Sequence, residues 1–246
     1  MNYEKEFYKY AKGHHNLNEL TIDDVVNHQI TSMTPMIIEE RQMNLISMSV
    51  FDRLMKDRIV WVSTGIDSRM ASVIQAQLMF LDSVEKRDII MHLDTPGGSV
   101  LSGLGIRDVM NYVSSDIATI NTGMCASMGS VLVSSGTKGK RSSLIFSKVM
   151  THQVSNGQSG NIQDNRISQM EAEKYNYILF KILAENCGRT FDEVIDISRR
   201  DKWFSSEEAL EFGLIDDIIG IDKHKSVSNY MEGFDNYYKK EVLGVN

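Results

Sequence analysis

Residues 121–130 read Asn-Thr-Gly-Met-Cys-Ala-Ser-Met-Gly-Ser, and they follow a run at 117–120 that is rich in β-branched side chains. Such a run favours a strand, and small residues around one hydroxyl suit a sharp turn from that strand into a helix. The turn would place Ser127 at the helix start, where unpaired N–H groups favour negative charge. Ser127 is therefore a candidate nucleophile, with the N–H of Met128 as a candidate oxyanion donor. Turns of small residues are also common packing devices, so both interpretations stay open at this point.

The composition is that of an ordinary globular protein. The 246 residues carry a net charge of −7, which gives no electrostatic reason to expect nucleic acid or an anionic membrane as a partner. The two cysteines, Cys125 and Cys187, form no disulfide framework and fit a reducing compartment. No apolar run approaches the roughly 20 residues of a membrane span. Residues 1–16 lack the hydrophobic core of a secretion signal. We therefore expect a soluble, cytoplasmic protein.

Strand-like and helix-like patterns alternate along the chain. The strand-like apolar runs lie at 59–62, 88–93 and 117–120, and the amphipathic helical patterns at 67–81 and 99–113. This alternation favours an α/β fold with right-handed crossovers between strands. In such sheets ligands gather at the carboxyl ends of the strands. Gly97, Gly98 and Ser127 all fall at such ends, so a site is expected there.

The second half of the chain supplies a histidine and a long helix. Two further strand-like runs lie at 143–146 and 148–151, and the second leads directly to His152. A helical pattern then runs over 162–186 and stops at Gly188. A helix of about 25 residues is long for a small domain. We therefore expect it to project from the domain and to contact another subunit.

The domain boundaries follow from shifts in composition. Residues 1–33 are polar and are expected to be a mobile arm or a removable leader. Residues 34–221 would form one domain, and residues 222–246 a polar, poorly ordered tail. Within the domain, two capping boxes start short helices near its end: they are Thr190 with Glu193, and Ser205 with Glu208.

A serine nucleophile needs a base, an orienting carboxylate and an oxyanion hole. The candidates are Ser127, His152 and Asp201, with the backbone N–H groups of Gly98 and Met128. Each lies at the end of an expected element rather than on a helix face. The order Ser, His, Asp differs from that of chymotrypsin, subtilisin and the α/β-hydrolases, so those folds gain no support.

The residues themselves are similar to a known family. Over about 34–221 the chain resembles the ClpP family of self-compartmentalised serine proteases, in several motifs with matching separations. The matching stretches are Met36-Ile37-Ile38-Glu39, Asp52-Arg53-Leu54, Pro96-Gly97-Gly98, Ala126-Ser127-Met128-Gly129, Lys138-Gly139-Lys140-Arg141, Val149-Met150-Thr151-His152-Gln153, Arg200-Asp201, Ser206-Glu207-Glu208-Ala209 and Glu211-Phe212-Gly213-Leu214-Ile215-Asp216. The resemblance implies a ClpP/crotonase-like fold of repeated ββα units with a projecting handle helix at about 155–187.

The resemblance also implies a function. The chain would be the proteolytic subunit of an ATP-dependent Clp-type protease, a serine endopeptidase that cleaves unfolded polypeptides inside two stacked heptameric rings. Arg200 and Asp164 would join the rings, and residues 37–49 would form the axial gate. An AAA+ unfoldase of the ClpX or ClpA type would bind ATP, so no cofactor or metal is expected in this chain, which lacks a phosphate loop.

The sequence departs from the family pattern at positions that would affect contacts with other subunits and with the unfoldase. The usual proline after the His-Gln pair is Val154, and Arg199 replaces a residue that is often acidic, which puts the ring-to-ring network in doubt. In the family an aromatic-lined cleft docks the unfoldase. The corresponding positions here are Leu78, Ile90, His92, Tyr112, Ser142 and Ile219. An altered docking site is therefore expected.

Two alternatives of other classes stay open. The chain could be a non-catalytic or accessory ring subunit that needs a ClpP paralogue, which the altered cleft and Arg199 would suit. It could also be a crotonase-like acyl-CoA enzyme, whose related fold uses a pair of backbone N–H groups at a glycine-containing turn. Such an enzyme would not need the Ser127, His152 and Asp201 arrangement.

Overall fold

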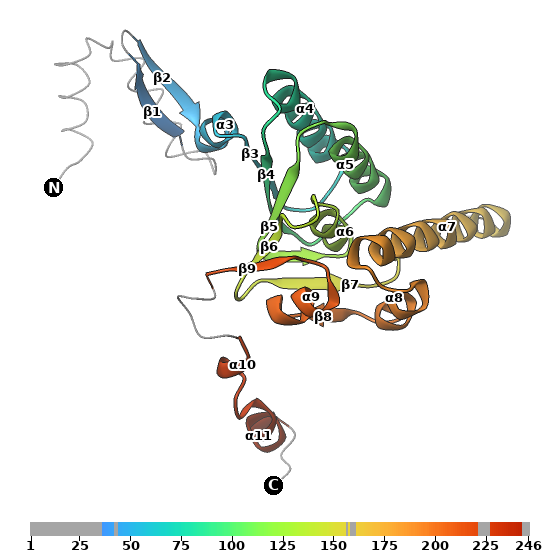
Figure 1. Ribbon diagram of the computed structural model, residues 1–246. Coiled ribbons are helices and arrows are strands. Elements are labelled where there is room, and N and C mark those ends of the chain that lie inside the picture. Colours follow the sequence, from blue (N-terminus) through green and yellow to red (C-terminus); the bar gives the residue numbers. More distant parts are fainter. Residues whose placement is uncertain (1–35, 42–43, 156, 158–160, 221–226, 243–246) are drawn as a thin grey trace. The chain divides into compact units, whose positions relative to one another are not determined.

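The structure is a computed structural model of the 246-residue chain. It describes residues 36–41, 44–155, 157, 161–220 and 227–242. The chain divides into two compact units, residues 1–59 and 60–246 (Figure 1). The arm expected at residues 1–33 lies outside the described residues, and so does the start of the polar tail.

The first unit contains a hairpin and a short helix. Strand β1 (Met36–Arg41) pairs antiparallel with strand β2 (Asn44–Ser49), and the extended stretch expected at 37–49 corresponds to this hairpin. Helix α3 (Val50–Lys56) follows. Its start is fixed by a capping box in which the Ser49 hydroxyl accepts from the Asp52 N–H at 3.0 Å.

The second unit is built on a mostly parallel sheet, as the alternating pattern predicted. The sheet has the order β3–β4–β5–β6–β9, in which β4, β5, β6 and β9 run parallel. The bounds are β3 (Ile59–Ser63), β4 (Ile89–Thr95), β5 (Ile117–Ala126), β6 (Arg141–Leu144) and β9 (Asp217–Ile219). The long strand β5 pairs with β6 over its first half and with β7 (Lys148–Thr151) over its second half. Strand β8 (Lys202–Phe204) then pairs antiparallel with β7.

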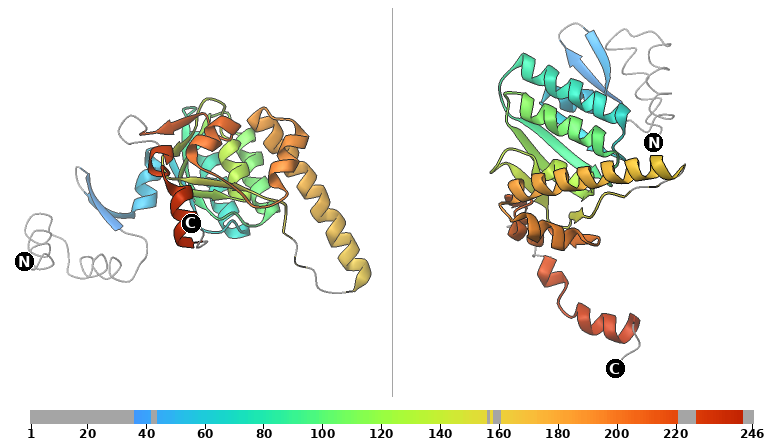
Figure 2. Two further views of the ribbon diagram at one scale, coloured as in Figure 1. Left: turned by 90° about the horizontal axis from the view of Figure 1, so that it is seen from below. Right: turned by 90° about the vertical axis from the view of Figure 1, so that its right-hand side faces the viewer.

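Helices cover one face of this sheet. Helix α4 (Ser68–Val84) and helix α5 (Val100–Tyr112) lie side by side, and α6 (Met128–Ser134) follows next to α5 (Figures 1 and 2). On β4 the side chains of Ile89, Met91 and Leu93 are fully buried, because they face these helices. Ile90 and His92 alternate with them and are only half-buried. One face of the sheet is therefore the core, and the other stays partly open.

A buried ion pair joins the end of this core to later parts of the chain. The Arg141 side chain is 1% exposed and binds Asp216 through two nitrogens, at 2.7 and 2.5 Å. A third nitrogen of Arg141 donates to the carbonyl oxygens of Ser134, at the end of α6, and of Asn186, at 3.1 and 2.9 Å. Every residue of α6 is buried. The helix that follows Ser127 is thus held at its far end by a guanidinium whose three nitrogens are all hydrogen-bonded.

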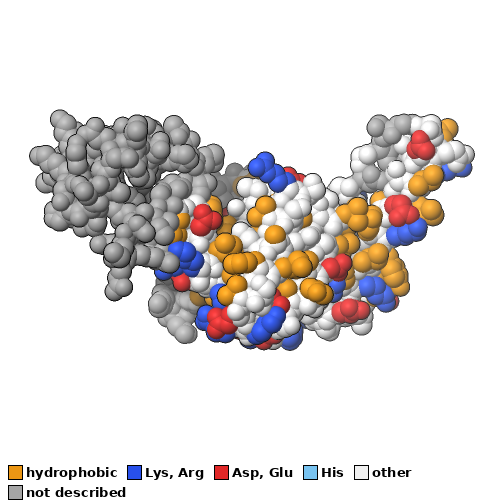
Figure 3. Space-filling view, turned by 90° about the horizontal axis from the view of Figure 1, so that it is seen from above, with side chains coloured by type: hydrophobic (Ala, Val, Ile, Leu, Met, Phe, Trp, Pro, Cys, Tyr) orange, Lys and Arg blue, Asp and Glu red, His pale blue; other side chains and the backbone are white. Residues whose placement is uncertain are grey.

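Helix α7 (Ile162–Cys187) projects from the second unit, as its predicted length indicated (Figure 2). The Gly188 that ends it has φ 66°, which only glycine adopts readily. Its buried residues begin at Leu179, towards its carboxyl end. The projecting part carries exposed apolar side chains (Figure 3). The exposed apolar residues of α7 include Ile162, Ile167, Met170, Tyr177 and Ile178.

The remaining elements confirm some boundaries and correct others. Both predicted capping boxes are present, at the starts of α8 (Phe191–Ser198) and α9 (Ser206–Phe212). Strand β6 lies two residues earlier than the predicted 143–146, because its ladder begins at Arg141 and residues 145–146 form a turn. The described part of the tail is helical rather than irregular, with α10 (Val227–Tyr230), α11 (Phe234–Tyr237) and a π-helical turn (Tyr238–Val242). Of the helices in the described residues, none combines the length and apolarity needed to cross a membrane.

Candidate active site

Ser127 occupies a strained turn between β5 and α6. Its backbone has φ 54° and ψ −119°, a conformation that costs a non-glycine residue on the order of 1–3 kcal/mol. The surroundings hold it there. The Ser127 N–H donates to the Met150 carbonyl oxygen at 2.9 Å, and the Ser127 carbonyl oxygen accepts from the Ser130 hydroxyl at 2.6 Å. The turn therefore presents the Ser127 hydroxyl in a fixed direction.

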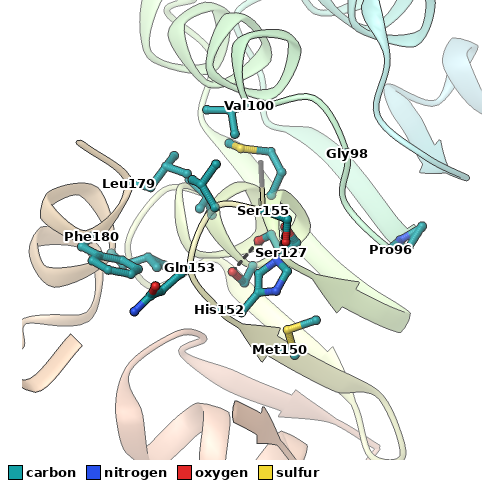
Figure 4. Close-up of a pocket in the computed structure, with 15 residues that line it drawn as sticks. Pro96, Gly98, Val100, Ser127, Met150, His152, Gln153, Ser155, Leu179 and Phe180 are labelled. Atoms are coloured by element: carbon teal, nitrogen blue, oxygen red, sulfur yellow. Dashed lines mark hydrogen bonds between the residues drawn. The ribbon is translucent and has the colours of Figure 1, made fainter. Parts of the chain in front are cut away.

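His152 reaches that hydroxyl from the end of β7. Because β5 and β7 pair in parallel up to Ala126 and Met150, the residues just beyond them, Ser127 and His152, emerge at the same edge of the sheet. The His152 Nε2 lies 2.8 Å from the Ser127 Oγ, a hydrogen bond drawn as a dashed line in Figure 4. This is the distance that a general base needs in order to take a proton from a serine.

Asp201 approaches the other nitrogen of the same imidazole. The antiparallel register of β7 and β8 pairs Thr151 with Lys202, so Asp201 is opposite His152 one step further on. The Asp201 Oδ1 lies 3.3 Å from the His152 Nδ1. The His152 side chain is 22% exposed and the Asp201 side chain 64% exposed. The carboxylate is thus placed to orient the imidazole, but it is open to water on most of its surface.

The glycine turn after β4 completes the arrangement. Ile66 donates to the Gly97 carbonyl oxygen at 2.7 Å and accepts from the Ser99 N–H at 2.8 Å. In this parallel bridge the N–H of Gly98 must point away from Ile66, and Gly98 lines the cavity beside Ser127. Met128 begins α6, so its N–H lies in the first turn, which has no intrahelical acceptor.

The two turns touch each other. A Cβ added at Gly97 would lie 2.8 Å from the Met128 nitrogen and 2.8 Å from the Ser127 Cβ. Gly97 has φ 88° and Gly98 has φ 149°, so both need the freedom of glycine. The two candidate N–H donors are therefore held close to the candidate nucleophile by a contact that admits no side chain at Gly97.

A cavity of about 270 Å³ opens next to Ser127 and His152 (Figure 4). Its polar end is formed by these two residues and the glycine turn. Its far wall is apolar and comes from α5, α6 and the base of α7, with Val100, Val131, Leu179, Phe180 and Leu183. An extended peptide could place a carbonyl at the polar end and an apolar side chain against this wall.

The neighbouring cysteine does not compete with the serine. Cys125 lies two residues before Ser127 and is fully buried. Burial raises the pKa of its thiol well above the usual value, and the nearby Asp94 charge raises it further. The thiol therefore stays protonated and unreactive. Within the described residues, no three His, Cys, Asp or Glu side chains are grouped so as to bind a metal ion.

The residues expected at ring contacts lie apart from the cavity. Asp164 is in the first turn of α7, where its carboxylate accepts from the Asn161 side chain at 2.5 Å. Arg200 is exposed just before Asp201, and it forms no ion pair within the part of the chain that the structure describes. Its neighbour Arg199 pairs instead with Asp196 at 3.0 Å. A single chain does not bring Arg200 and Asp164 into an ion pair.

Four of the six predicted docking positions, Ile90, His92, Ser142 and Ile219, lie on the open face of the sheet. The other two, Leu78 and Tyr112, lie on helices α4 and α5. The register pairs His92 with Ile120 and Ile120 with Ser142, so these side chains form a row on that face. Ile90 shares the face, while Tyr112 at 76% and Ile219 at 40% are exposed. Leu78 is 0% exposed and lies in the core. As a direct contact for a partner it is wrong in this conformation, because it presents no surface.

The sequence patterns missed an aromatic residue on this face. Trp61 stacks on His92 with the ring centroids 4.8 Å apart and the planes 16° from parallel. Burial lowers the pKa of His92. A second hollow of about 440 Å³ on the described surface is lined by apolar side chains that include Leu144, Phe146 and Ile219. The alternation of β3 could have indicated that Trp61 points away from the core, since its neighbours Val60 and Val62 are buried.

Comparison with known proteins assigns the chain to a family. A family model described as Clp protease matches residues 41–222. The chain belongs to the Clp protease family. Similar proteins named ATP-dependent Clp protease proteolytic subunit include one from Bacteroides fragilis (strain YCH46), 46% identical over 87% of this chain and 98% of its own length. Another, from Porphyromonas gingivalis, is 47% identical over 87% of this chain and 97% of its own. A third, from Streptococcus agalactiae, is 42% identical over 76% and 97%.

Membership of the Clp protease family decides between the classes left open by the sequence. The chain is a proteolytic subunit of a Clp-type protease, and it is a serine peptidase. No finding favours an accessory subunit or an acyl-CoA enzyme. The fold expected from the resemblance, an α/β fold of the ClpP type, is confirmed.

Proposed function

We propose that Ser127, His152 and Asp201 are the catalytic triad of this serine peptidase. The observation that carries the proposal is the 2.8 Å contact between the His152 Nε2 and the Ser127 Oγ, made from a backbone conformation that only its surroundings can maintain. Asp201 supports it from 3.3 Å on the opposite nitrogen. This constellation is recognised by geometry and roles rather than by the order of residues in the chain.

The reaction follows from these positions. His152 takes the proton of the Ser127 hydroxyl as the oxygen attacks the peptide carbonyl, and it later gives that proton to the leaving amine. Asp201 holds the imidazole with its Nδ1–H towards the carboxylate and stabilises the charged ring. A water molecule, activated by His152 in the same way, then attacks the ester between Ser127 and the peptide. The peptide leaves with a new C-terminal carboxylate, and His152 returns the proton to Ser127.

The N–H groups of Gly98 and Met128 are proposed to bind the oxyanion. Both residues line the cavity at Ser127, and their turns are in contact. Loss of one such donor costs on the order of 3 kcal/mol of transition-state stabilisation in a serine protease. The apolar wall beyond them favours a hydrophobic side chain next to the cleaved bond.

We propose that the chain works in an assembly of two stacked heptameric rings in the cytoplasm. The exposed apolar side chains along α7 are suited to contact between copies, because apolar side chains grouped on one exposed element often mark a protein–protein contact. Asp164 and Arg200 would meet across the rings, and the β1–β2 hairpin would form the axial gate. The substrates would be unfolded polypeptides, cut into short peptides within the chamber.

An AAA+ unfoldase is the proposed partner that supplies such substrates. The relatives named above are called ATP-dependent, and this sequence holds no phosphate loop of its own. The proposed docking surface is the open sheet face with Ile90, His92, Ser142 and Ile219, together with the exposed Tyr112 at the end of α5. Trp61 belongs to it through its stack on His92, while Leu78 would support it only from beneath.

The test of the proposed function is peptide hydrolysis. The purified chain, sorted by particle size, is assayed on a short fluorogenic peptide beside Ser127→Ala. We expect turnover by a large particle, and a fall in kcat on the order of 10⁶-fold, to background, in the variant. An assembled but silent wild type, or a Ser127→Ala variant that keeps its activity, would contradict the proposal.

A further inference from the structure

One hydrogen bond ties the segment after His152 to the projecting helix. The backbone N–H of Val154 donates to the Oδ1 of Asn176 on α7 at 2.7 Å. The β7–β8 ladder ends at Thr151, before this segment begins. Among the described residues, this is the only hydrogen bond that residues 153–155 make. The backbone next to the candidate base is therefore attached to α7 at a single point.

Asn176 lies where α7 leaves the body of the second unit. The buried part of the helix begins with Leu179 and Phe180, one turn later, and both line the cavity at Ser127. Tyr177, next to Asn176, contacts the Phe191 ring with centroids 4.9 Å apart. Residues further towards the tip, such as Met170, are exposed. Asn176 is thus on the last anchored turn, so its side chain has a fixed position relative to the cavity.

We propose that Asn176 is a positioning residue, which holds His152 against Ser127 by binding the Val154 N–H. The inference rests on the proposed roles of Ser127 and His152. The need for such a restraint comes from the other side of the imidazole, where Asp201 is 64% exposed at 3.3 Å and restrains the ring only loosely. A displacement of about 1 Å in a catalytic group costs about 10²-fold in rate.

The restraint depends on the residue at position 154 as well. A proline there has no N–H and could not donate to Asn176. This chain has a valine, so the bond exists and links the rate of hydrolysis to the placement of α7. Asn176 and Val154 should therefore act as a pair, and a double-mutant cycle can separate their shared contact from other effects.

The experiment compares Asn176→Ala, Asn176→Asp, Val154→Pro and the double variant Asn176→Ala/Val154→Pro on the short peptide, with particle size measured for each. We expect Asn176→Ala to lower kcat about tenfold with KM within about twofold. Asn176→Asp keeps an acceptor oxygen and should stay within about twofold of wild type. Val154→Pro should lower kcat about as much as Asn176→Ala does. The double variant should lower kcat no further than either single variant, because both substitutions remove the same hydrogen bond.

Gln169→Ala is the matched control on the same helix. The Gln169 side chain bonds to Glu173 of α7 itself, so its removal should leave kcat, KM and particle size unchanged. The positioning role would be overturned if the losses in kcat of the two single variants multiplied in the double variant. It would also be overturned if Asn176→Ala changed KM alone, or if Asn176→Asp lost as much kcat as Asn176→Ala. Loss of the particle in Asn176→Ala would overturn it too, in favour of a role in assembly. An inactive wild type would instead contradict the proposed function.

Discussion

The two sides of the proposed triad are built in different ways. Ser127 is followed by a helix in which every residue is buried, and its own backbone is held at φ 54° by bonds on both sides. Asp201 lies on a short connection between α8 and β8, and its side chain is 64% exposed. Two residues before it, Arg199 pairs with Asp196 at the surface, with side chains 69% and 68% exposed.

This difference shows which part of the chemistry the single chain prepares. The position of the nucleophile is over-determined by packing, and strain can be kept there because the surroundings leave no alternative. The position of the carboxylate follows from the end of the short, three-pair ladder of β7 and β8 and from a 3.3 Å contact to His152. Substitutions around Ser127 should therefore lower the rate of hydrolysis more than substitutions around Asp201.

Gly97→Ala tests the serine side and should have the largest effect. The new Cβ would lie 2.5 Å from the Ala126 carbonyl oxygen and 2.8 Å from the Met128 nitrogen, at φ 88°. Because these are backbone atoms, the Ser127 turn must move. We expect hydrolysis to fall by about 10³-fold or more, and the free energy of unfolding by about 3 kcal/mol. Kinetics and denaturant unfolding measure the two losses.

The matched control for that variant is Gly139→Ala. Gly139 has a similar φ of 84°, but a Cβ there meets no heavy atom within 4 Å. Gly139→Ala should lower the free energy of unfolding by about 1 kcal/mol through backbone strain alone, and it should leave the rate of peptide hydrolysis unchanged. If Gly97→Ala behaved like Gly139→Ala, the serine turn would be adaptable, and the contrast between the two sides would disappear.

Asp216→Asn tests the support beneath the serine side. Arg141, which binds the end of α6, would stay buried without its counter-charge, and breaking such a pair costs about 3 kcal/mol. Burial alone would raise the pKa of Asp216, but the hydrogen bonds and charge of Arg141 outweigh this effect and hold the pKa well below its usual range. Thermal unfolding at several pH values should show the loss, with hydrolysis at neutral pH nearly unchanged.

The pH dependence of that loss has a defined sign. The pKa of this carboxyl is lower in the folded state than in the unfolded state, where it is about 4. Its ionised form therefore stabilises the fold at every pH above about 4, and this stabilisation is lost as the pH falls from about 4 through the folded-state pKa. The difference between wild type and Asp216→Asn should therefore be full at neutral pH and shrink below about pH 4. Asp217→Asn, on the exposed neighbour, should change stability by less than about 0.5 kcal/mol. A difference that grew in acid would exclude the Arg141 pair as its source.

Much of the fold was predictable because its signals are local. The capping residues Thr190 and Ser205 start their helices as expected, and the predicted strand at 148–151 is β7. The predicted helix at 162–186 ends one residue later, at Cys187. Each of these depends on residues within a few positions of one another, which a single sequence displays directly.

The parts that were missed depend on distant residues. In the sequence Arg141 stood out only as the end of the stretch Lys138-Gly139-Lys140-Arg141, yet it is buried against Asp216, 75 positions away. Strand β5 continues past Gly123 to Ala126 because β7 pairs with its second half. For the site, the residue types left Ser127 open between a nucleophile and a packing turn. Their positions at element ends made His152 and Asp201 candidate partners, and the resemblance implied their roles. The register of β5, β7 and β8 explains why they meet.

Asp201→Asn probes the weaker side of the comparison, and it should lower hydrolysis less than Gly97→Ala does. Removing the triad aspartate of other serine proteases costs about 10⁴-fold in kcat. Here water already reaches the carboxylate and the contact to His152 is 3.3 Å, so we expect a loss of about 10²-fold. Steady-state kinetics would measure it, with Asp196→Asn as an equally exposed control that should keep full activity. A loss of 10⁴-fold or more would mean that Asp201 is shielded from water in the active particle. The aspartate side would then be completed by assembly, whereas the serine side is complete in one chain.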